Sequence, residues 1–556
     1  MEKKLEGPDP ARWGVLAAVC GGLFMIMLQS NVINIAVTRI QKDFGVSLET
    51  VEWVTNGYLL VFTSLLVLLG RLGDRFGRKL MFLGGVVVYT AGAFAAGFAH
   101  SIGLLIGGAL IQGVGGAAMM PATLSLITVN FDKKERGAAL GVWGAVSGLA
   151  VAVGPTLGGY LTDVGLGDAI NSVLHLEQGW RAIYFLNCLV GVAVFLAALF
   201  LIKESRDGSV HHGFDVVGTV LSAVAQFALV YGLINASRYG WIRRKEAFTV
   251  AGWTAPLGDL SVTPVLVAFA LVVGVFFILW EKSRKSDPLM ELSLFRNVNY
   301  SAGSLVAAIL NFAMMGSFFL IPVFLQGVLG FSATRAGLAM LPLALAVIVA
   351  SPVAGRLTDR FGARWVIVIG MAVLAAGGFL TARFALTTSV ASLIVPFAIQ
   401  GLGIGLAMAP ITNAALFGVP IGIAGAASGT LSMIRQFGSI LGIAIMAAVF
   451  SSGIAPHMQR SVEALDPAKV PAVVKEKILS GLSSGTSSQP SGEEMKKMLS
   501  FYSKKRGEEI SGAVSGAMKQ GMVDSINETF RYAAGVAVLG ACAALLLRGK
   551  KKEDGE

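Results

Sequence analysis

The chain contains a series of uninterrupted apolar segments, each long enough to cross a lipid bilayer. A membrane-spanning helix needs about 20 consecutive apolar residues. Segments of this kind fall near residues 13–37, 51–69, 79–99, 102–128, 137–161, 182–202, 215–235, 262–280, 298–322, 334–354, 365–385, 390–416, 425–451 and 529–547. Because they are continuous rather than alternating, a transmembrane β-barrel is excluded, and backbone inside lipid must then be helical. The sequence therefore predicts an all-α polytopic membrane protein with about fourteen spanning helices.

The charged residues are few and are placed as in a membrane protein. Only 14% of the 556 residues are Asp, Glu, Lys or Arg, whereas a soluble protein has about 25%. The net charge of +11 comes from basic residues in short loops between the apolar segments, such as Arg71, Arg75, Arg78 and Lys79. Such residues indicate topology rather than a nucleic-acid-binding surface. They predict a multi-pass protein of the cytoplasmic (cell) membrane with both termini in the cytoplasm.

The apolar segments lack the residues that indicate catalysis or metal binding. The three cysteines, Cys20, Cys188 and Cys542, stand inside apolar segments, so no disulfide or metal framework is predicted. The acidic residues and histidines fall in loops or at segment ends, with Glu52 and Asp215 nearest to a segment interior. We therefore expect no enzyme activity, no cofactor and no bound metal.

One loop sequence occurs twice. Residues 70–79 read GRLGDRFGRK and residues 355–364 read GRLTDRFGAR, and each copy follows the second segment of a set of six. The repeat predicts a six-helix bundle over residues 1–203, two inserted helices and a linker over 204–297, and a second six-helix bundle over 298–556. Two related bundles with a binding site between them are typical of transporters.

Several motifs together carry a resemblance to a known family. Besides the loop at 70–79, residues 53–55 read WVT, residues 58–60 read YLL, residues 154–159 read GPTLGG, and residues 180–187 begin with Trp-Arg and end with Asn. In these motifs the chain resembles the major facilitator superfamily, in its fourteen-helix drug:proton antiporter branch of the multidrug efflux type. The resemblance covers nearly the whole chain.

The resemblance implies alternating access, in which two bundles rock about a central cavity. The repeated loop would tie one bundle to the other in one state, and the GPTLGG segment would let a helix bend and pack closely. The residues expected to serve this conformational change are Gly70, Arg71, Asp74, Arg75, Gly77, Arg78, Gly154, Pro155, Gly158, Gly159, Asp359 and Arg360. Two alternatives remain open: the loop as a simple positive anchor, and the glycines as structural packing, like Gly438 and Gly442 in a later segment.

Two positions depart from the pattern of the branch. Its first segment usually carries an Asp, where this chain has Gln29, with Asn31 in the Thr position. Its fourth segment usually carries an Arg, where this chain has Ala109 before Gln112. Both members of a charge pair are therefore absent together, which fits the high cost of an unpaired charge at membrane depth. A proton-independent uniporter or lipid flippase remains an alternative to the antiporter that the resemblance implies.

Neutral polar residues and one arginine are the candidates for contact with a substrate. They are Gln29, Asn31, Asn34, Asn56, Gln112, Asn311, Asn413 and Arg435. Arg435 stands well inside an apolar segment, where an arginine is functional by default and is suited to an anionic head group. For the amides the alternative is a hydrogen bond between helices, and for Arg435 it is a structural contact with helix-end carbonyls.

The sequence thus predicts a secondary-type transporter that exports lipophilic drugs, lipids or other amphiphiles, with membrane lipids around it and no nucleic-acid partner. A membrane scaffold or sensor would not need two copies of a gating loop. The outer loop 452–528 has helix-compatible flanks at 461–480 and 493–523. These predict an amphipathic hairpin, which would bind an extracytoplasmic partner or the membrane interface, with a passive linker as the alternative.

Overall fold

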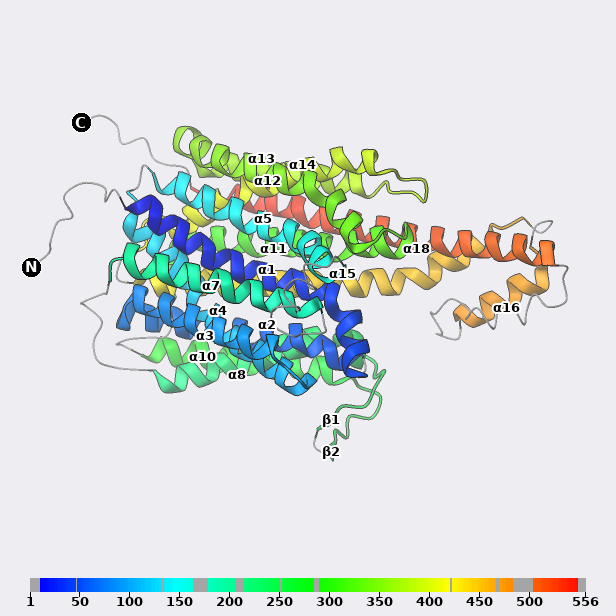
Figure 1. The fold of residues 1–556 in the computed structure, drawn as a ribbon, viewed down its shortest axis with the longest axis horizontal. Helices are drawn as coiled ribbons and strands as arrows, with labels where there is room; N and C mark the ends of the chain where they lie inside the picture. Colours follow the sequence, from blue (N-terminus) through cyan, green and yellow to red (C-terminus); the bar gives the residue numbers. More distant parts are fainter. Residues whose placement is uncertain are drawn as a thin grey trace, which may run out of the picture.

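A computed structural model gives the fold, and it describes residues 11–46, 48–132, 135–163, 179–205, 215–250, 253–284, 290–420, 423–466, 470–483 and 504–548. Long helices lie side by side in one bundle (Figure 1). Each of the fourteen expected segments coincides with a long helix. Twelve helices of the described chain are long and apolar enough to cross a membrane, and the other two positions are occupied by α5 and α18.

Twelve of the long helices of the described chain form two sets of six along the sequence. The first set consists of α1 (Arg12–Phe44), α2 (Leu48–Phe76), α3 (Arg78–Gly97), α4 (Ile102–Asn130), α5 (Arg136–Asp163) and α7 (Ala182–Leu201), the last preceded by the 3-10 turn η1 (Gly179–Arg181). The second set consists of α11 (Val298–Pro322), α12 (Ala333–Phe361), α13 (Ala363–Thr381), α14 (Val390–Leu416), α15 (Ala424–Glu463) and α18 (Lys504–Ala544), with η2 (Leu292–Arg296) before it. We call these sets the first half and the second half.

The inserted helices lie on the outside of the two halves. They are α8 (Val216–Ile234) and α10 (Val262–Ser283), connected through the short α9 (Ala236–Tyr239) and a two-stranded antiparallel hairpin, β1 (Thr249–Val250) and β2 (Trp253–Thr254). An apolar cluster joins α8 to α2 and α15; its buried members are Leu60, Val230, Leu233, Ile440 and Ala444. The insert therefore covers a seam between the halves and leaves the space between them to the two six-helix sets.

The repeated loop makes the same tight turn in both halves. Gly77, between α2 and α3, has a φ of 119°, and Gly362, between α12 and α13, has a φ of 81°. These values lie in the region that residues with a side chain rarely adopt. The glycine at the eighth position of each copy of the repeat therefore has a backbone reason for its identity, and it reverses the chain within one residue.

Close helix packing depends on the small residues. A Cβ atom added at Gly438 or Gly442 of α15 would overlap backbone atoms of Ala308 or Phe312 in α11. The small-residue face predicted for this helix is therefore confirmed. In α11 the last turn widens into a π-helical turn, η3 (Val323–Val328), directly after Pro322, which is a common site of such an irregularity.

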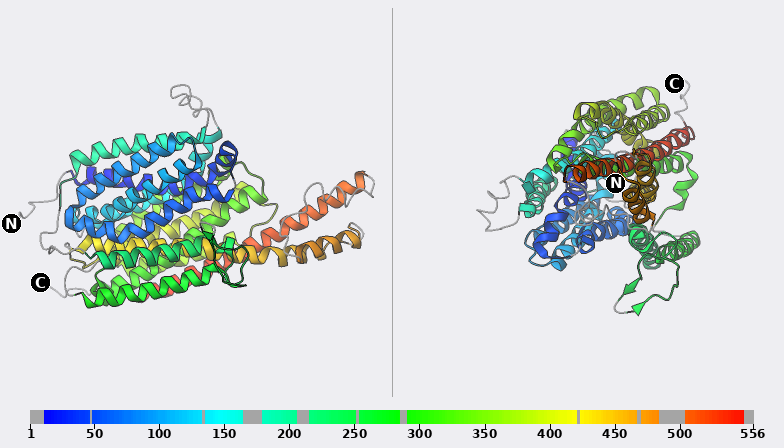
Figure 2. Two further views of the ribbon diagram at one scale, coloured as in Figure 1. Left: turned by 90° about the horizontal axis from the view of Figure 1, so that it is seen from below. Right: turned by 90° about the vertical axis from the view of Figure 1, so that its right-hand side faces the viewer.

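Two helices extend beyond the bounds of the predicted apolar segments. α15 continues past residue 451 to Glu463, and α18 begins at Lys504 rather than near 529. With α16 (Ala472–Ser483) they form an arm that projects from one end of the bundle (Figures 1 and 2). The arm has its own apolar core, made of Met458, Val462, Val470, Val474, Ile478, Ile510, Val514, Ala517 and Met518. Burial of these side chains stabilises helix outside the apolar segments.

Candidate functional site

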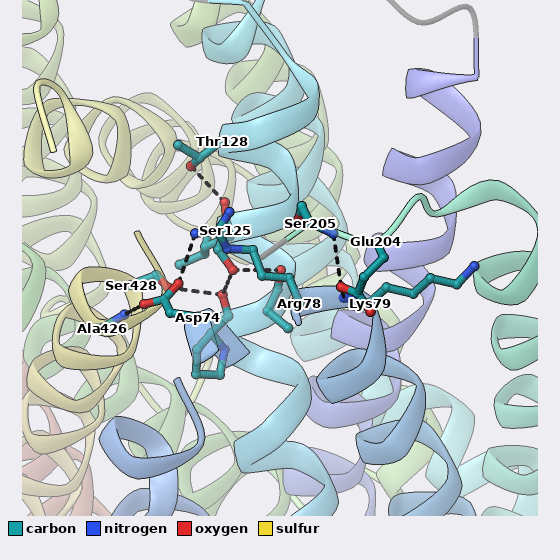
Figure 3. Close-up of polar contacts among 12 residues, drawn as sticks. Asp74, Arg78, Lys79, Ser125, Thr128, Glu204, Ser205, Ala426 and Ser428 are labelled. Atoms are coloured by element: carbon teal, nitrogen blue, oxygen red, sulfur yellow. Dashed lines mark hydrogen bonds and ion pairs between the residues drawn. The ribbon is translucent and has the colours of Figure 1, made fainter. Parts of the chain in front are cut away.

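The carboxylate of Asp74 connects the two halves. Asp74 stands near the end of α2 and is fully buried. Its Oδ1 accepts a hydrogen bond of 3.0 Å from Nη2 of Arg78, and its Oδ2 accepts one of 2.7 Å from the backbone N–H of Ala426 in the first turn of α15 (Figure 3). The first N–H groups of a helix lack partners within the helix and carry partial positive charge. Asp74 therefore caps a helix of the opposite half.

A second bond crosses between the halves beside Asp74. The hydroxyl of Ser428 in α15 donates to the carbonyl of Pro121 in α4 at 3.0 Å (Figure 3). A Cβ atom on Gly429 would lie 3.0 Å from the carbonyl oxygen of Leu66 in α2. The start of α15 is therefore in direct contact with α2 and α4. We call the contacts of Asp74, Arg78, Ala426 and Ser428 the latch.

The latch is also held within the first half. The carboxylate of Glu204, after α7, accepts hydrogen bonds of 3.2 Å from the backbone N–H groups of Lys79 and Leu80, and so caps α3 (Figure 3). Arg78 donates its backbone N–H to the carbonyl of Ser205 at 3.2 Å. The loop that carries Arg78 is thus fixed from two sides. Of the other residues predicted for the loop, Gly70 and Gly77 are buried, and Arg71 and Arg75 are half-buried.

The second copy of the loop also contacts the opposite half, but through the backbone rather than through a side chain. A Cβ atom on Gly355 of α12 would lie 2.6 Å from the carbonyl oxygen of Gly137, in the first turn of α5. A Cβ atom on Gly137 would in turn lie 3.2 Å from Oδ1 of Asp359. Asp359 and Arg360 are exposed, unlike Asp74 and Arg78. The two copies therefore occupy equivalent places, and the deeply buried ion pair belongs to the first.

Three buried amides meet within the first half. Nε2 of Gln29 in α1 donates to Oε1 of Gln112 in α4 at 3.0 Å, and Nδ2 of Asn187 in α7 donates to Oε1 of Gln29 at 3.0 Å. Gln29 and Gln112 are fully buried, and Asn187 is 1% exposed. The two glutamines were predicted as site residues, and Asn187 was known only as the end of a sequence motif. We call these three residues the amide cluster.

The amide cluster occupies the place where the resemblance to the antiporter branch implies an Asp. Gln29 stands where the related branch has Asp, and Gln112 is bonded to it directly. The amides bind one another with no net charge, although Nε2 of Gln112 and Oδ1 of Asn187 have no partner among the described residues, whereas a lone charge here would be costly. The open alternative of hydrogen bonding between helices therefore holds for Gln29 and Gln112.

The remaining predicted residues fall into two groups. Asn311 is buried and donates to the carbonyl of Ala307 in its own helix at 2.8 Å, while Asn56 and Asn413 are half-buried. Gly154 and Gly158 are buried in α5. The side chains of Asn31, Asn34 and Pro155, and the surroundings of Gly159, lie outside the described residues.

Arg435 lies where helices of the two halves meet. Its Nη2 donates to the hydroxyl of Thr412 in α14, and its guanidinium lies 5.5 Å from the ring centroid of Trp143 in α5. Trp143 is fully buried and donates its indole N–H to the hydroxyl of Thr123 in α4 at 3.2 Å. The recorded bond of Arg435 goes to a side chain, not to the helix-end carbonyls of the structural alternative. Trp143 and Thr123 were not predicted, and no motif in the sequence points to them.

Comparison with known proteins agrees with this geometry. Residues 19–443 match the family described as Major Facilitator Superfamily. The tetracenomycin C resistance and export protein of Streptomyces glaucescens is 34% identical over 442 residues, which are 80% of this chain and 76% of that protein. The multidrug resistance protein Stp of Mycobacterium tuberculosis (strain ATCC 25618 / H37Rv) is 33% identical over 446 residues, 79% of this chain and 77% of that protein.

Solved structures show the same fold at low sequence identity. A bacterial homologue of the human lysosomal transporter Spinster, in an inward-facing and unoccupied conformation, has a TM-score of 0.55 at 16% identity and covers 98% of this chain and 100% of its own. The proton:xylose symporter XylE has a TM-score of 0.53 at 12% identity, over 81% of this chain and 91% of its own. With twelve membrane-length helices in the described part of the chain, a duplicated loop and these relatives, the chain belongs to the major facilitator superfamily of membrane transporters.

Proposed function

We propose that this transporter exports amphiphilic, drug-like molecules from the cytoplasm by alternating access. The observation that carries the proposal is the bond between Asp74 Oδ2 and the Ala426 N–H, because it joins the two halves at one end of the bundle. Relatives named for tetracenomycin C resistance and export, for multidrug resistance and for puromycin resistance support a drug-like substrate. We further propose the domain division at 1–203, 204–297 and 298–556.

The proposed orientation rests on the basic loops. The latch end carries Arg71, Arg75 and Arg78, and such residues favour the cytoplasmic side. α1 begins and α18 ends at this same end (Figure 1). In the cytoplasmic membrane, this orientation places both termini in the cytoplasm. The latch then closes the cytoplasmic side of the transporter. The arm would face outward, where it can contact an extracytoplasmic partner.

A flux assay in liposomes tests the proposal. Purified protein is reconstituted with a fluorescent lipophilic amine or acid inside the vesicles, and efflux is followed with and without an imposed pH gradient. We expect flux that depends on the protein and saturates with substrate concentration. No flux for any of several amphiphiles would reject transport and favour the scaffold alternative.

The amide cluster favours a second hypothesis, in which transport is not coupled to protons. Proton coupling generally requires a group that titrates within reach of the pathway, and Gln29, Gln112 and Asn187 do not titrate. A uniporter or a lipid flippase would work without such a group. If flux is unchanged when the pH gradient is removed, this reading replaces antiport, whereas flux that follows the gradient requires a proton-binding group elsewhere.

A further inference from the structure

The two halves hold equivalent bonds at the place where Arg435 and Trp143 meet. In α4 the sequence Pro121-Ala122-Thr123 ends in a threonine that accepts the indole N–H of Trp143 from α5. In α14, the fourth helix of the second half, Pro410-Ile411-Thr412 ends in a threonine that accepts Nη2 of Arg435 from α15. In each half the fifth helix thus donates to a threonine two residues after a proline of the fourth helix.

This equivalence distinguishes the structural role of the Arg435 hydrogen bond from the role of its positive charge. In the first half a neutral indole makes the bond between the fourth and fifth helices, so the bond does not require a cation. The positive charge of Arg435 is therefore additional to what packing needs. A buried guanidinium without a counter-charge destabilises the folded state, so its presence indicates a function.

The side chain has free donors in a buried place. Arg435 is 5% exposed, and its Nε and Nη1 atoms are buried without a hydrogen-bond partner in the described structure. The Cζ atom of Arg435 lies over the ring of Trp143, 5.5 Å from its centroid, and the indole supplies only a cation–π contact. Nε and Nη1 lie at different edges of the planar guanidinium, and each can donate one charge-assisted hydrogen bond to a carboxylate or phosphate oxygen.

The helices around Arg435 do not supply the counter-charge. α4, α11 and α14 contain no Asp or Glu. The acids of α5 and α15 are Asp163 and Glu463, which lie about 30 Å and 40 Å along their axes from Trp143 and Arg435 at 1.5 Å per residue. Asp74 of α2 binds at the level of Ala426, about 14 Å along α15 from Arg435. Asp359 of α12 lies at the level of Gly137, about 9 Å along α5 from Trp143, and it is exposed. No acid of these described helices stands at the level of Arg435, so a bound ligand must supply the counter-charge.

We propose that Arg435, over the ring of Trp143, binds an anionic group of the substrate, such as a carboxylate, a phenolate or a phosphate. This inference rests on the proposed transport function and names the substrate class. Because Trp143 belongs to the first half and Arg435 to the second, the anion would sit at the boundary that opens and closes. An aromatic anion fits this place best, since it can contact the indole and the guanidinium together.

The test compares two ligands that differ only in charge. Anthracene-9-carboxylate and its neutral amide are titrated against the purified full-length protein in uncharged detergent, with gluconate as the buffer anion, and binding is read from ligand fluorescence. In the wild type we expect the carboxylate to bind about 10- to 100-fold more tightly than the amide, the range for a charge-assisted hydrogen bond. In Arg435→Gln, which keeps an N–H donor for Thr412, the two ligands should bind equally. Arg435→Lys should retain part of the preference.

A control and a stability measurement exclude a merely structural role. Arg383→Gln removes an exposed arginine outside the site and should leave the preference for the carboxylate unchanged. If Arg435 only supported the fold, Arg435→Gln would lower Tm. Because the variant removes an uncompensated buried charge, we expect Tm to stay equal or to rise. An equal carboxylate preference in wild type and Arg435→Gln would overturn the inference.

The source of the anion is decided by a chloride titration. If chloride is needed for the amide to bind wild type but not Arg435→Gln, the counter-charge is a free inorganic ion, and the assignment of an anionic substrate is overturned. If chloride only competes with the carboxylate, the substrate anion is supported. Binding does not require transport, so carboxylate binding through Arg435 without flux in liposomes would reject export and leave this inference standing.

Discussion

The Oδ2 atom of Asp74 lies 2.7 Å from the backbone nitrogen of Ala426, a residue 352 positions later in the chain. One carboxylate thereby holds Arg78 within its own half and caps a helix of the other half. Rocking of the halves must break the second contact while the first can persist. The cost of opening this end is therefore set in part by a single, identifiable bond.

Asp74→Asn should weaken the closed state of the latch end. The amide keeps an oxygen for Ala426 but loses the charge that pairs with Arg78 and the helix N-terminus, and breaking a buried ion pair costs about 3–5 kcal/mol. We expect export to slow by 10-fold or more. In a variant lacking Cys20, Cys188 and Cys542, a cysteine at Ser428 should react faster with a thiol reagent when Asp74 is Asn. The matched control is Asp359→Asn at the exposed second copy, and equal effects of the two changes would contradict the asymmetry of the latch.

Gly355→Val should open the same end by steric means. A Cβ atom on Gly355 would lie 2.6 Å from the carbonyl oxygen of Gly137, a backbone atom of the other half that cannot move aside. We expect faster labelling at Ser428→Cys with little change in Tm. Gly438→Val is the control, because Gly438 meets Ala308 within its own half. That change should lower Tm instead. If Gly355→Val lowers Tm as much as Gly438→Val, the contact serves folding rather than gating.

Gln29→Glu should introduce a pH dependence that the wild type lacks. The new carboxyl group is nearly isosteric and stands among Gln112 and Asn187, away from water. Burial favours the protonated form over the charged one, so the folded state binds more protons than the unfolded state. Stability of the variant must then fall as pH rises from about 5 to 8. Melting curves across this range test the change, with Gln29→Met as the non-titrating control.

The transport consequence of Gln29→Glu is measured separately. A protonatable group in the first half can respond to the imposed gradient, so efflux by Gln29→Glu should change with the pH gradient more than efflux by the wild type. A variant whose stability follows pH while its flux ignores the gradient would place the amide cluster outside the coupling pathway.

Ile510→Ala should loosen the arm and leave the bundle intact. Ile510 is fully buried in the small apolar core that α15, α16 and α18 share, and Ile→Ala in a core costs about 2–5 kcal/mol. We expect faster hydrogen exchange in residues 472–483 and 504–520 and unchanged exchange in α2 to α5. Val473→Ala, at an exposed position of α16, is the control. Faster exchange throughout the bundle would show that the arm is not an independent unit.

The sequence by itself determined the class of fold, the number of long helices and the place of the duplicated loop. These follow from local properties, namely the length of apolar segments and a repeated turn that requires glycine at a positive φ. It also indicated Gln29, Gln112 and Arg435, because polar groups inside apolar segments are costly and therefore few, and it indicated Asp74 through the repeated loop. It did not place the end of α15 or the start of α18, whose outer parts depend on a core formed between helices.

Only the tertiary structure decided which of these residues meet. Gln112 and Asn187 are 83 and 158 positions from Gln29, and no local pattern relates them. The bond of Arg435 to Thr412 and its place over Trp143 depend on how three helices are rotated about their axes. Rotation and tilt are set by packing of small residues and by interhelical hydrogen bonds, which involve distant parts of the chain together. The length of an apolar segment determines that a helix crosses the membrane. The neighbouring helices determine which side chains of that helix face them.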